Sequence, residues 1–390
     1  MKMMEEGIEK YVTELRRYFH ANPELSEYEY STMKRICMEM DDIGIPYVKC
    51  VAGTGVCATL DGGTGPVVGI RADIDALPIT EKNQCDYISQ NVGVMHACGH
   101  DAHIAIALGI AKTLKKYQNE LIVSVKFFFQ PADETIGGAE RMIKEGVLER
   151  PRVDYVLGLH VEPQYSAGTV GIRYGQMYAA SDMIDIKVNG KGAHGAHPNE
   201  GIDAILIAAE ILNAIQNIIS REIDPRDAVV CSIGKIKGGE VRNQIAEHVQ
   251  MEGIIRTLNN DIRIPVRNRV REVVEKTAKF YGGEAKMEVI PSYPALTNDY
   301  ELTSIIEKTM AEFLGPEQVL LENTPDMSCE DFSFFAEECP SAYFHLGCRC
   351  QREEVVNELH NSRFDIDEKC LLKGVELQVR NILSIMEYYK

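Results

Sequence analysis

The chain has 390 residues, of which 45% are hydrophobic and 26% charged, so its composition is that of a globular protein whose core needs neither disulfides nor a structural metal. Asp and Glu total 59 against 41 for Lys and Arg, and the formal net charge of -18 argues against a general binder of nucleic acid or of anionic membranes. Acidic residues near the start, the lack of an apolar run of membrane-spanning length and 11 cysteines without a regular framework predict a cytoplasmic protein.

Helical and strand patterns alternate along the first part of the chain. The predicted elements are helices at 5–19, 31–43, 103–117 and 139–145, and strands at 56–60, 66–72, 121–130 and 155–160. The strands at 56–60 and 66–72 flank a glycine-rich turn, which is a strand-turn-strand pattern. Strands that alternate with helices predict an α/β sandwich.

The middle of the chain has a different order of elements. It predicts strand, helix, strand, strand, helix and strand at 183–188, 203–221, 229–236, 249–256, 262–281 and 286–290. This βαββαβ order is that of a small ferredoxin-like unit. We therefore expect residues 1–180 and 292–390 to form one larger domain, interrupted by an inserted domain at 181–291.

Four short motifs, far apart in the chain, contain residue types that bind transition metals. They are His96-Ala97-Cys98-Gly99-His100, Asp133-Glu134, Gly158-Leu159-His160 and Leu359-His360-Asn361. Thiolate, imidazole and carboxylate are the ligands of zinc and related metals. Each motif alone is more often structural, because buried cysteines, satisfied histidines and solvated acidic turns are common. Together they predict a site assembled at the centre of the fold, where catalysis is a more common use than a closed structural site.

Two pairs of carboxylates follow predicted strands. Asp133 and Glu134 end the strand at 121–130, and neighbouring residues at a strand end can face different ways. One carboxylate can then bind metal while the other acts as a general base. Asp75 follows the strand at 66–72 and could orient a ligand imidazole, or it could simply cap backbone N–H groups in a turn. In the insert, His194 lies in a glycine-rich loop and suits a donor to a developing oxyanion.

These motifs resemble one family closely. It is the metal-dependent amidohydrolases that include aminoacylase, carboxypeptidase G-type enzymes and succinyl-diaminopimelate desuccinylase, and in particular the branch of hippurate hydrolase, N-acetyl-diaminopimelate deacetylase and the indole-acetyl-amino-acid hydrolases. The resemblance is carried by the segments 19–26, 71–78, 96–101, 192–194, 255–257, 330–333 and 359–360. It implies a mixed-sheet catalytic α/β domain of the phosphorylase/hydrolase-like zinc exopeptidase type with an inserted ferredoxin-like α+β lid or dimerisation domain.

The resemblance also implies a set of site residues. The implied metal ligands are Cys98, His100, Glu134, His160 and His360, for two divalent transition metal ions, Zn or Mn, with Ni and Co as alternatives. The implied general base is Asp133, the implied support of the metal site is Asp75, and the implied substrate contacts from the insert are His194, Asn243 and Arg256. The implied reaction is hydrolysis of a small N-acyl amino acid to a carboxylic acid and an amino acid, by a homodimer joined through the insert.

One position departs from the family pattern, which has Glu where this chain has Asp133. Aspartate is one methylene shorter, roughly 1 Å of reach, and a misplacement of that size can cost about a hundredfold in rate. We expect a working enzyme, because every implied metal ligand is present. The alternatives are a dipeptidase or carboxypeptidase on the same scaffold, a metal-binding protein whose catalysis is weakened at Asp133, and a closed structural metal site.

Overall fold

The computed structural model describes residues 7–349 and 357–389, and the chain folds as two compact units. The first unit is Met1–Gly175, Thr297–Thr324 and Asp331–Lys390, and the second is Gln176–Leu296 and Pro325–Glu330. The sequence-based division placed 176–180, 292–296 and 325–330 in the larger domain, whereas these segments cluster with the second unit. The reason is backbone pairing, because Asp326 N donates to Met177 O at 2.8 Å and Ala179 N to Ser328 O at 2.9 Å.

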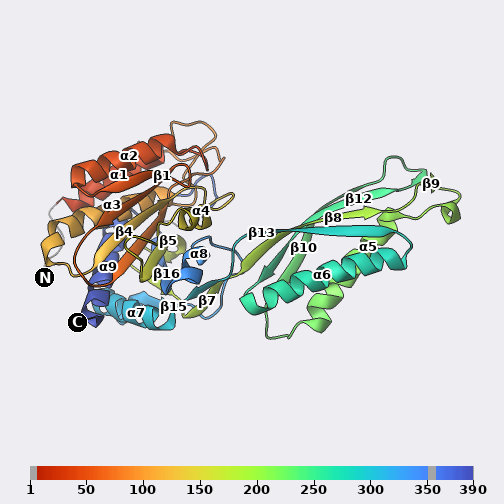
Figure 1. Ribbon diagram of the computed structural model, residues 1–390. Helices are drawn as coiled ribbons and strands as arrows, with labels where there is room; N and C mark the ends of the chain where they lie inside the picture. The colour runs from red at the N-terminus through yellow and green to blue at the C-terminus, as the bar shows by residue number, and fades with distance from the viewer. Residues whose placement is uncertain (1–6, 350–356, 390) are drawn as a thin grey trace. The chain divides into compact units, whose positions relative to one another are not determined.

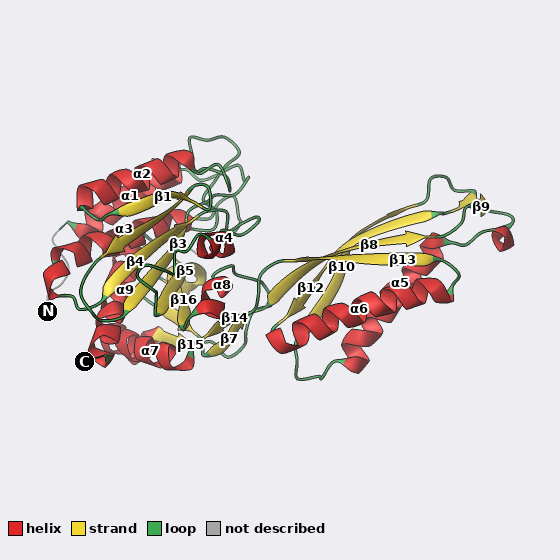
Figure 2. Cartoon of the chain, viewed as in Figure 1, coloured by secondary structure: helices red, strands yellow, loops and turns green. Residues whose placement is uncertain are grey.

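An eight-stranded mixed sheet forms the centre of the first unit (Figures 1 and 2). In order across the sheet its strands are β1 (Tyr47–Val51), β2 (Gly55–Leu60), β4 (Ser124–Gln130), β3 (Val67–Asp73), β5 (Tyr155–Ser166), β16 (Ser341–Arg349), β6 (Val170–Ile172) and β15 (Val319–Leu321). The run β4, β3, β5 and β16 is parallel throughout. All residues of β3 and β4 are buried, which is why these strands read as unbroken rather than alternating patterns. The mixed α/β class expected from the sequence is confirmed.

Helices pack on this sheet. They are α1 (Ile8–Ala21), α2 (Tyr30–Ile43), α3 (His100–Lys116), α4 (Ala139–Lys144), α7 (Tyr300–Leu314), α8 (Ser333–Glu338) and α9 (Lys369–Tyr388). Helix α3 is almost wholly buried, and it contacts α1, α9 and the sheet. It begins after Gly99, whose φ of 86° and lack of Cβ are both required, since a Cβ there would lie 2.2 Å from Cγ2 of Val161. The first two residues of the helix predicted at 5–19 lie outside the described residues.

The strand-turn-strand prediction for 56–60 and 66–72 is wrong in one respect. The two strands form, but β4 lies between them, antiparallel to β2 and parallel to β3. The glycine-rich connection is not a hairpin turn, because it wraps around the segment leading into β4. Gly65 N donates to Ile122 O at 2.7 Å, and a Cβ on Gly62 would lie 1.9 Å from Val123 O.

The second unit contains a four-stranded antiparallel sheet in the order β10 (Val229–Gly238), β12 (His248–Thr257), β8 (Ala180–Asn189) and β13 (Glu284–Pro291). Helices α5 (Ala204–Asn217) and α6 (Asn260–Phe280) pack on it (Figure 1). Its chain order β8, α5, β10, β12, α6 and β13 is the ferredoxin-like order read from the sequence. Short strands β9 (Ala193–His194) and β11 (Gln244–Ile245) pair with each other.

One helical stretch, Ala204–Glu222, is long and apolar enough to cross a membrane by length and composition alone. Its buried residues include Ile207, Ile211 and Ile215, which belong to the apolar core of the second unit. Its packing is therefore that of an amphipathic core helix.

Candidate metal centre

Five residues from four separate segments of the first unit meet near the carboxyl ends of its parallel strands. Cys98 and His100 stand at the start of α3, Glu134 follows β4, His160 lies in β5, and His360 lies in the segment before α9. Open parallel sheets place their sites at this edge, because the loops that follow the strands converge there. The fold thus explains how motifs more than two hundred residues apart supply one site.

Close contacts join the five ligands predicted from the resemblance. Sγ of Cys98 lies 3.5 Å from Nε2 of His160. Oε1 of Glu134 lies 3.8 Å from Nε2 of His100 and 3.3 Å from Nε2 of His360. Ligand atoms of Cys98, Glu134 and His360 all lie within 4.8 Å of one another. This spacing fits one or two metal ions, and it combines a thiolate, imidazoles and a carboxylate.

The histidine tautomers also suit metal binding. Nδ1 of His100 lies 2.9 Å from the carbonyl oxygen of Asp75 and 3.2 Å from its Oδ1, and Nδ1 of His160 lies 2.8 Å from the carbonyl oxygen of Val161. Carbonyl oxygens only accept, so both Nδ1 atoms carry a proton, and each ring in its neutral form has its lone pair on Nε2. Nε2 of His100 is buried and makes no hydrogen bond with the described residues. A buried ring nitrogen with no hydrogen-bond partner among the described residues fits a metal ligand. Asp75 orients the His100 ring through Nδ1, as carboxylates do for ligand histidines in other metal sites.

The pKa values of Cys98 and His100 are raised in the protein without metal, so both side chains hold protons that a bound cation would displace. Burial and the neighbouring Glu134 carboxylate raise the pKa of the Cys98 thiol well above its usual range. Burial lowers the pKa of His100, but the Asp73 and Asp75 carboxylates outweigh it and hold that pKa well above its ordinary value. A divalent cation takes thiolate and neutral imidazole, so its binding would release protons from both residues.

Asp133 lies beside this cluster and is held by an arginine. Ligand atoms of His100, Asp133 and Glu134 lie within 4.8 Å of one another. Nη2 of Arg71 lies 2.5 Å from Oδ1 of Asp133 and 2.7 Å from Oδ1 of Asp331. Arg71 and Asp331 are fully buried, so the guanidinium fixes one oxygen of Asp133 at the edge of the cluster.

A family model described as peptidase family M20/M25/M40 matches residues 69–384, which is most of the chain. The chain belongs to this peptidase family. Membership confirms the resemblance drawn from the motifs and makes the protein a hydrolase, and the cluster at His160 gives it the ligands of a metal-dependent one.

Three relatives illustrate the range of the M20/M25/M40 family around this chain. Thermostable carboxypeptidase 2 of Saccharolobus solfataricus is 37% identical over 372 residues, covering 94% of this chain and 93% of the relative. N-acetyl-L-cysteine deacetylase of Bacillus subtilis is 36% identical over 368 residues, covering 94% and 86%. The YxeP protein of Bacillus subtilis, a dinuclear metal binding peptidase from the M20 family, has a crystal structure that matches with a TM-score of 0.84 at 30% identity, covering 98% and 99%.

The site of this M20 hydrolase includes two residues that sequence reasoning did not assign, Asp73 and His103. Nδ1 of His103 lies 2.5 Å from Oδ1 of Asp73, and Nε2 of His103 accepts from Val161 N at 3.0 Å. Both ring nitrogens are therefore used, so His103 supports the backbone beside His160 rather than binding metal. The available signal was spacing, because His103 follows His100 by three residues in a helix and shares its face.

A second polar group adjoins the metal centre of the M20 fold. His345 in β16 is the register partner of His160 in β5, so both side chains leave the same face of the sheet. Nδ1 of His345 lies 2.6 Å from Oε1 of Glu322, which also accepts from the Tyr165 hydroxyl at 3.0 Å. No motif pointed to these residues, since each is an isolated polar residue in an apolar strand or at a strand end.

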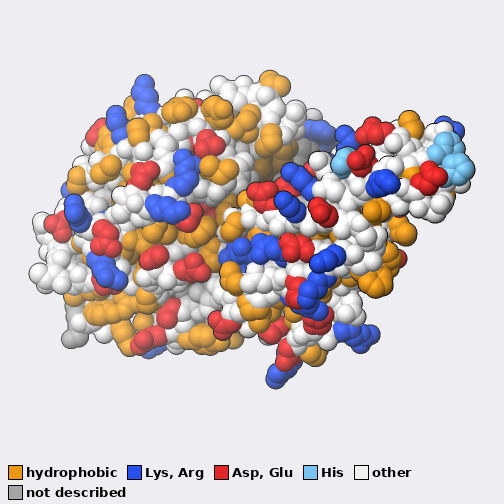
Figure 3. Space-filling model, turned by 45° about the vertical axis from the view of Figure 1, so that its right-hand side comes forward, with side chains coloured by type: hydrophobic (Ala, Val, Ile, Leu, Met, Phe, Trp, Pro, Cys, Tyr) orange, Lys and Arg blue, Asp and Glu red, His pale blue; other side chains and the backbone are white. Residues whose placement is uncertain are grey.

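The three residues assigned to substrate contact lie in the second unit. His194 in β9 is exposed and pairs in register with Gln244, next to Asn243, whose carbonyl oxygen accepts from Gly195 N at 2.8 Å. The rings of His194 and His197 lie 5.5 Å apart, and Figure 3 shows histidine side chains gathered on the surface of this unit. Arg256 in β12 is half-buried, and its Nη1 makes no hydrogen bond with the described residues. Their roles toward substrate stay predictions.

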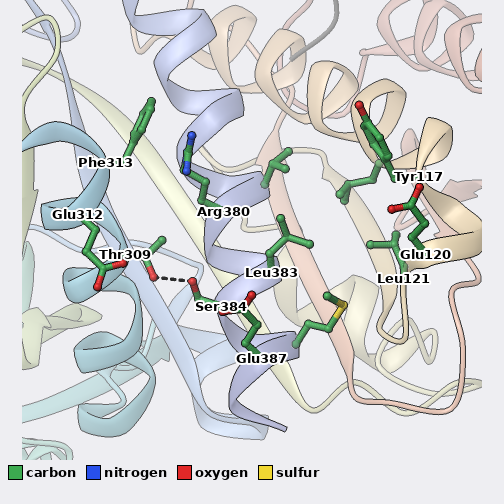
Figure 4. Close-up of a pocket in the computed structure, with 13 residues that line it drawn as sticks. Tyr117, Glu120, Leu121, Thr309, Glu312, Phe313, Arg380, Leu383, Ser384 and Glu387 are labelled. Carbon is green, nitrogen blue, oxygen red and sulfur yellow. Dashed lines mark hydrogen bonds between the residues drawn. The ribbon is translucent and has the colours of Figure 1, made fainter. Parts of the chain in front are cut away.

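A pocket of roughly 600 Å³ lies elsewhere in the first unit, between the end of α3, α7 and α9 (Figure 4). Its rim carries Glu120, Glu312, Glu387 and Arg380 over an apolar floor. None of the metal-ligand candidates lines it. It is therefore separate from the metal centre.

Proposed function

We propose that this protein hydrolyses the amide bond of N-acyl amino acids, with acetyl or aryl-acyl groups, to a carboxylic acid and a free amino acid. We further propose that it does so with two divalent metal ions, Zn or Mn in the first place and Ni or Co as alternatives. The proposal draws support from the family, from a relative named N-acetyl-L-cysteine deacetylase and from the dinuclear metal site of the YxeP structure.

The observation that carries the proposal is the convergence of thiol, imidazole and carboxylate atoms from distant segments on one site. Nε2 of His160 faces Sγ of Cys98, and Nε2 of His100, which makes no hydrogen bond within residues 7–349 and 357–389, faces Oε1 of Glu134. A structural zinc site would be closed by four ligands. Here a further acid, Asp133, adjoins the ligands without being needed among them. An adjoining free carboxylate is what general base catalysis requires.

The chain's own residues account for the proton transfers. Bound divalent metals would lower the pKa of water and polarise the amide carbonyl. Asp133 takes a proton from the attacking water, whose oxygen bonds to the carbonyl carbon. When the carbon–nitrogen bond breaks, Asp133 returns that proton to the leaving nitrogen, which departs as the amine of the amino acid. Arg71, bonded to Oδ1 of Asp133, orients the carboxylate through both transfers.

The second unit has a proposed part in binding substrate. His194 donates to the oxyanion that forms at the carbonyl, and Asn243 and Arg256 bind the carboxylate of the amino acid. Nη1 of Arg256 supports the last role, because it has no hydrogen-bond partner in the part of the chain that the structure describes. We also propose a cytoplasmic homodimer joined through this unit, because β10 and β13 are the edge strands of its sheet, and Ile205 and Leu206 of α5 are 49% and 51% exposed. Light scattering would show the dimer, and exchange of the edge residue Ile236 for Lys should weaken it.

A second candidate is a dipeptidase or carboxypeptidase, favoured by the relative named thermostable carboxypeptidase 2. Its substrates differ in carrying a free amine or a longer peptide on the acyl side. A third candidate is a metal-binding protein with weakened catalysis, favoured by the short side chain of Asp133. It would bind substrate tightly without turnover.

The test is amino acid release from a substrate panel by protein loaded with each metal in turn. The panel contains N-acetyl and N-benzoyl amino acids and dipeptides with the same carboxyl-terminal residues. We expect release from the N-acyl series to depend on metal and to exceed release from the dipeptides. Fully metal-loaded protein that releases amino acid only from dipeptides would replace the proposal with the second candidate, and release from neither series would leave the third.

A further inference from the structure

The loop between β4 and α4 carries Asp133 and Glu134, and its backbone has an unfavourable conformation at Ala132. Ala132 has a φ of 57°, in the left-handed region that an L-residue with a Cβ adopts only when its surroundings hold it there. Asp133 follows directly, so the angles at Ala132 set the direction in which the Asp133 side chain leaves the backbone. Whatever holds Ala132 therefore also aims Asp133.

A buried acid from a distant segment binds this peptide. Glu29, fully buried before α2, accepts the Ala132 N–H through Oε1 at 3.0 Å. Its other oxygen, Oε2, accepts the hydroxyl proton of Thr54 at 2.5 Å. The carboxylate is thus fixed at both oxygens, and one of its two bonds goes to the loop rather than to another side chain.

Two further hydrogen bonds from backbone N–H groups fix the conformation of this loop. Gly137 N donates to the carbonyl oxygen of Ala132 at 2.9 Å, which closes the loop upon itself. Glu134 N donates to Oδ2 of Asp75 at 3.0 Å. Asp133 therefore lies between two anchored peptide groups, and Glu29 supplies the anchor on its amino-terminal side.

We propose that Glu29 is a positioning residue for the reaction, which holds Ala132 in its left-handed conformation and thereby aims the Asp133 carboxylate at the attacking water. The inference rests on the proposed function, in which Asp133 is the general base. It assigns to Glu29 no contact with substrate or metal, and the described contacts of Glu29 include none with the five metal-ligand candidates.

Removal of the Glu29 carboxylate has a defined consequence. In Glu29→Ala the Ala132 N–H loses its acceptor inside the protein, and the backbone is free to relax to a negative φ. Such a change swings Asp133, and a displacement of about 1 Å can cost a hundredfold in rate. We expect kcat to fall roughly 10- to 100-fold, while KM and metal content stay within about twofold, because Glu134, the metal-ligand candidate in this loop, keeps its own anchor at Asp75.

Two further variants separate positioning from general loss of structure. Glu29→Gln keeps an oxygen acceptor for Ala132 N–H and an amide that can donate to Thr54, so its kcat should stay within a few-fold of the parent. Glycine adopts positive φ without the penalty of a Cβ, so Ala132→Gly added to Glu29→Ala should recover part of the lost kcat. Glu39→Ala removes another buried acid, one that binds Tyr11 and Arg35 far along α2, and should lower the melting temperature without lowering kcat.

The experiment measures kcat, KM, metal content and hydrogen exchange of the Ala132 amide in these variants. We expect fast exchange and low kcat in Glu29→Ala, near-parental values in Glu29→Gln, and partial recovery of kcat in the double variant. Parental kcat or a protected Ala132 amide in Glu29→Ala would overturn the inference.

If Glu29→Ala does not fold, Thr54→Val provides the test, because it removes one of the two hydrogen bonds to the Glu29 carboxylate. It should lower kcat and speed the exchange of the Ala132 amide in the same way, and unchanged values in Thr54→Val would overturn the inference. If the parent releases no amino acid from any substrate, the proposed function fails, and the Ala132 exchange alone decides whether Glu29 holds the loop.

Discussion

Sγ of Cys98 lies 3.5 Å from Nε2 of His160, although 62 residues separate them in the chain. The imidazole presents its lone pair to the thiol, because its Nδ1 proton goes to the carbonyl of Val161. The thiol itself resists ionisation, since burial and the Glu134 carboxylate raise its pKa. A thiol that stays protonated can donate to this lone pair, whereas a divalent cation between the two atoms would take both as ligands and displace the thiol proton.

Loss of the thiol is therefore expected to weaken metal binding. Cys98→Ala should reduce metal affinity by more than about tenfold and lower the metal retained after dialysis. Loss of a residue that only orients a ligand already costs about tenfold or more, and loss of a direct ligand should cost at least as much. Metal analysis of purified protein checks this. Cys57→Ala is the matched control, since Cys57 is also a buried free cysteine of the first unit but lies in β2 away from the cluster. Equal metal content in all three proteins would exclude Cys98 as a ligand.

Substitutions at Asp133 and Glu134 should have different effects, because only Glu134 is a proposed metal ligand. Asp133→Asn should lower kcat by about 10²- to 10⁴-fold, the range for loss of a general base, with metal content unchanged. Asp133→Glu should keep or raise kcat, since it restores the longer side chain. Glu134→Gln should lower metal content as well as rate. If Asp133→Asn turns over at the parental rate, the proton must be taken by another group.

The sequence predicted the parts of the fold that depend on local pattern and missed those that depend on distant neighbours. Apolar periodicity located helices and strands between residues 5 and 290, and the βαββαβ order of the second unit was readable from the chain alone, but no pattern predicted α7, α8, β16 or α9. The position of β4 between β2 and β3 was not, because it depends on Gly62 and Gly65 packing on Ile122 and Val123. Strand β1 was missed because its side chains are mostly exposed and do not alternate.

The residues of the site also fall into those that the sequence predicted and those that it missed. The ligand candidates stood in short motifs with recognisable residue types, so the resemblance found them. Arg71, His103 and Glu29 were not assigned roles, because their significance lies in hydrogen bonds to Asp133, Asp73 and Ala132 that no spacing reveals. For Arg71 the available signal was an arginine in an apolar strand two residues before Asp73, since a buried charge requires partners.

Asp75 should matter for metal affinity rather than directly for chemistry. Its backbone and side-chain oxygens accept the Nδ1 proton of His100, and Oδ2 accepts Glu134 N. Asp75→Ala should therefore weaken metal binding by about 10- to 100-fold, and excess metal should restore much of the rate. A titration of activity against metal concentration checks this. Ser26→Ala, which removes only the hydroxyl that donates to Oδ2 of Asp75, should have a smaller effect. A rate loss that excess metal does not restore would place Asp75 in the chemistry.

His20 links α1 to the start of α3 and should make stability depend on pH. Its Nδ1 lies 2.7 Å from Oδ2 of Asp101, and its Nε2 lies 3.1 Å from Oε1 of Glu81, in a fully buried site. Burial and Arg16 lower the pKa of His20, but the two carboxylates outweigh them and raise it above its usual value. Burial raises the pKa of Glu81, but the bond from His20 and further hydrogen bonds lower it overall.

These two pKa shifts determine how the stability of the protein changes with pH. A raised His pKa gives stability that is fully present below the unfolded value, about 6.5, and that is lost as pH rises through the folded value. The lowered Glu81 pKa gives stability that is present above about 4.3 and lost as pH falls below it. Parental protein should therefore exceed His20→Gln in melting temperature by on the order of 5 °C near pH 6, and the difference should shrink as pH rises through the raised pKa of His20. Thermal unfolding in chelator, which removes the contribution of metal ligands, checks this against His248→Gln, an exposed histidine whose loss should give no such trend. A difference between parent and His20→Gln that stays constant or grows with pH would show that His20 is neutral in the folded protein.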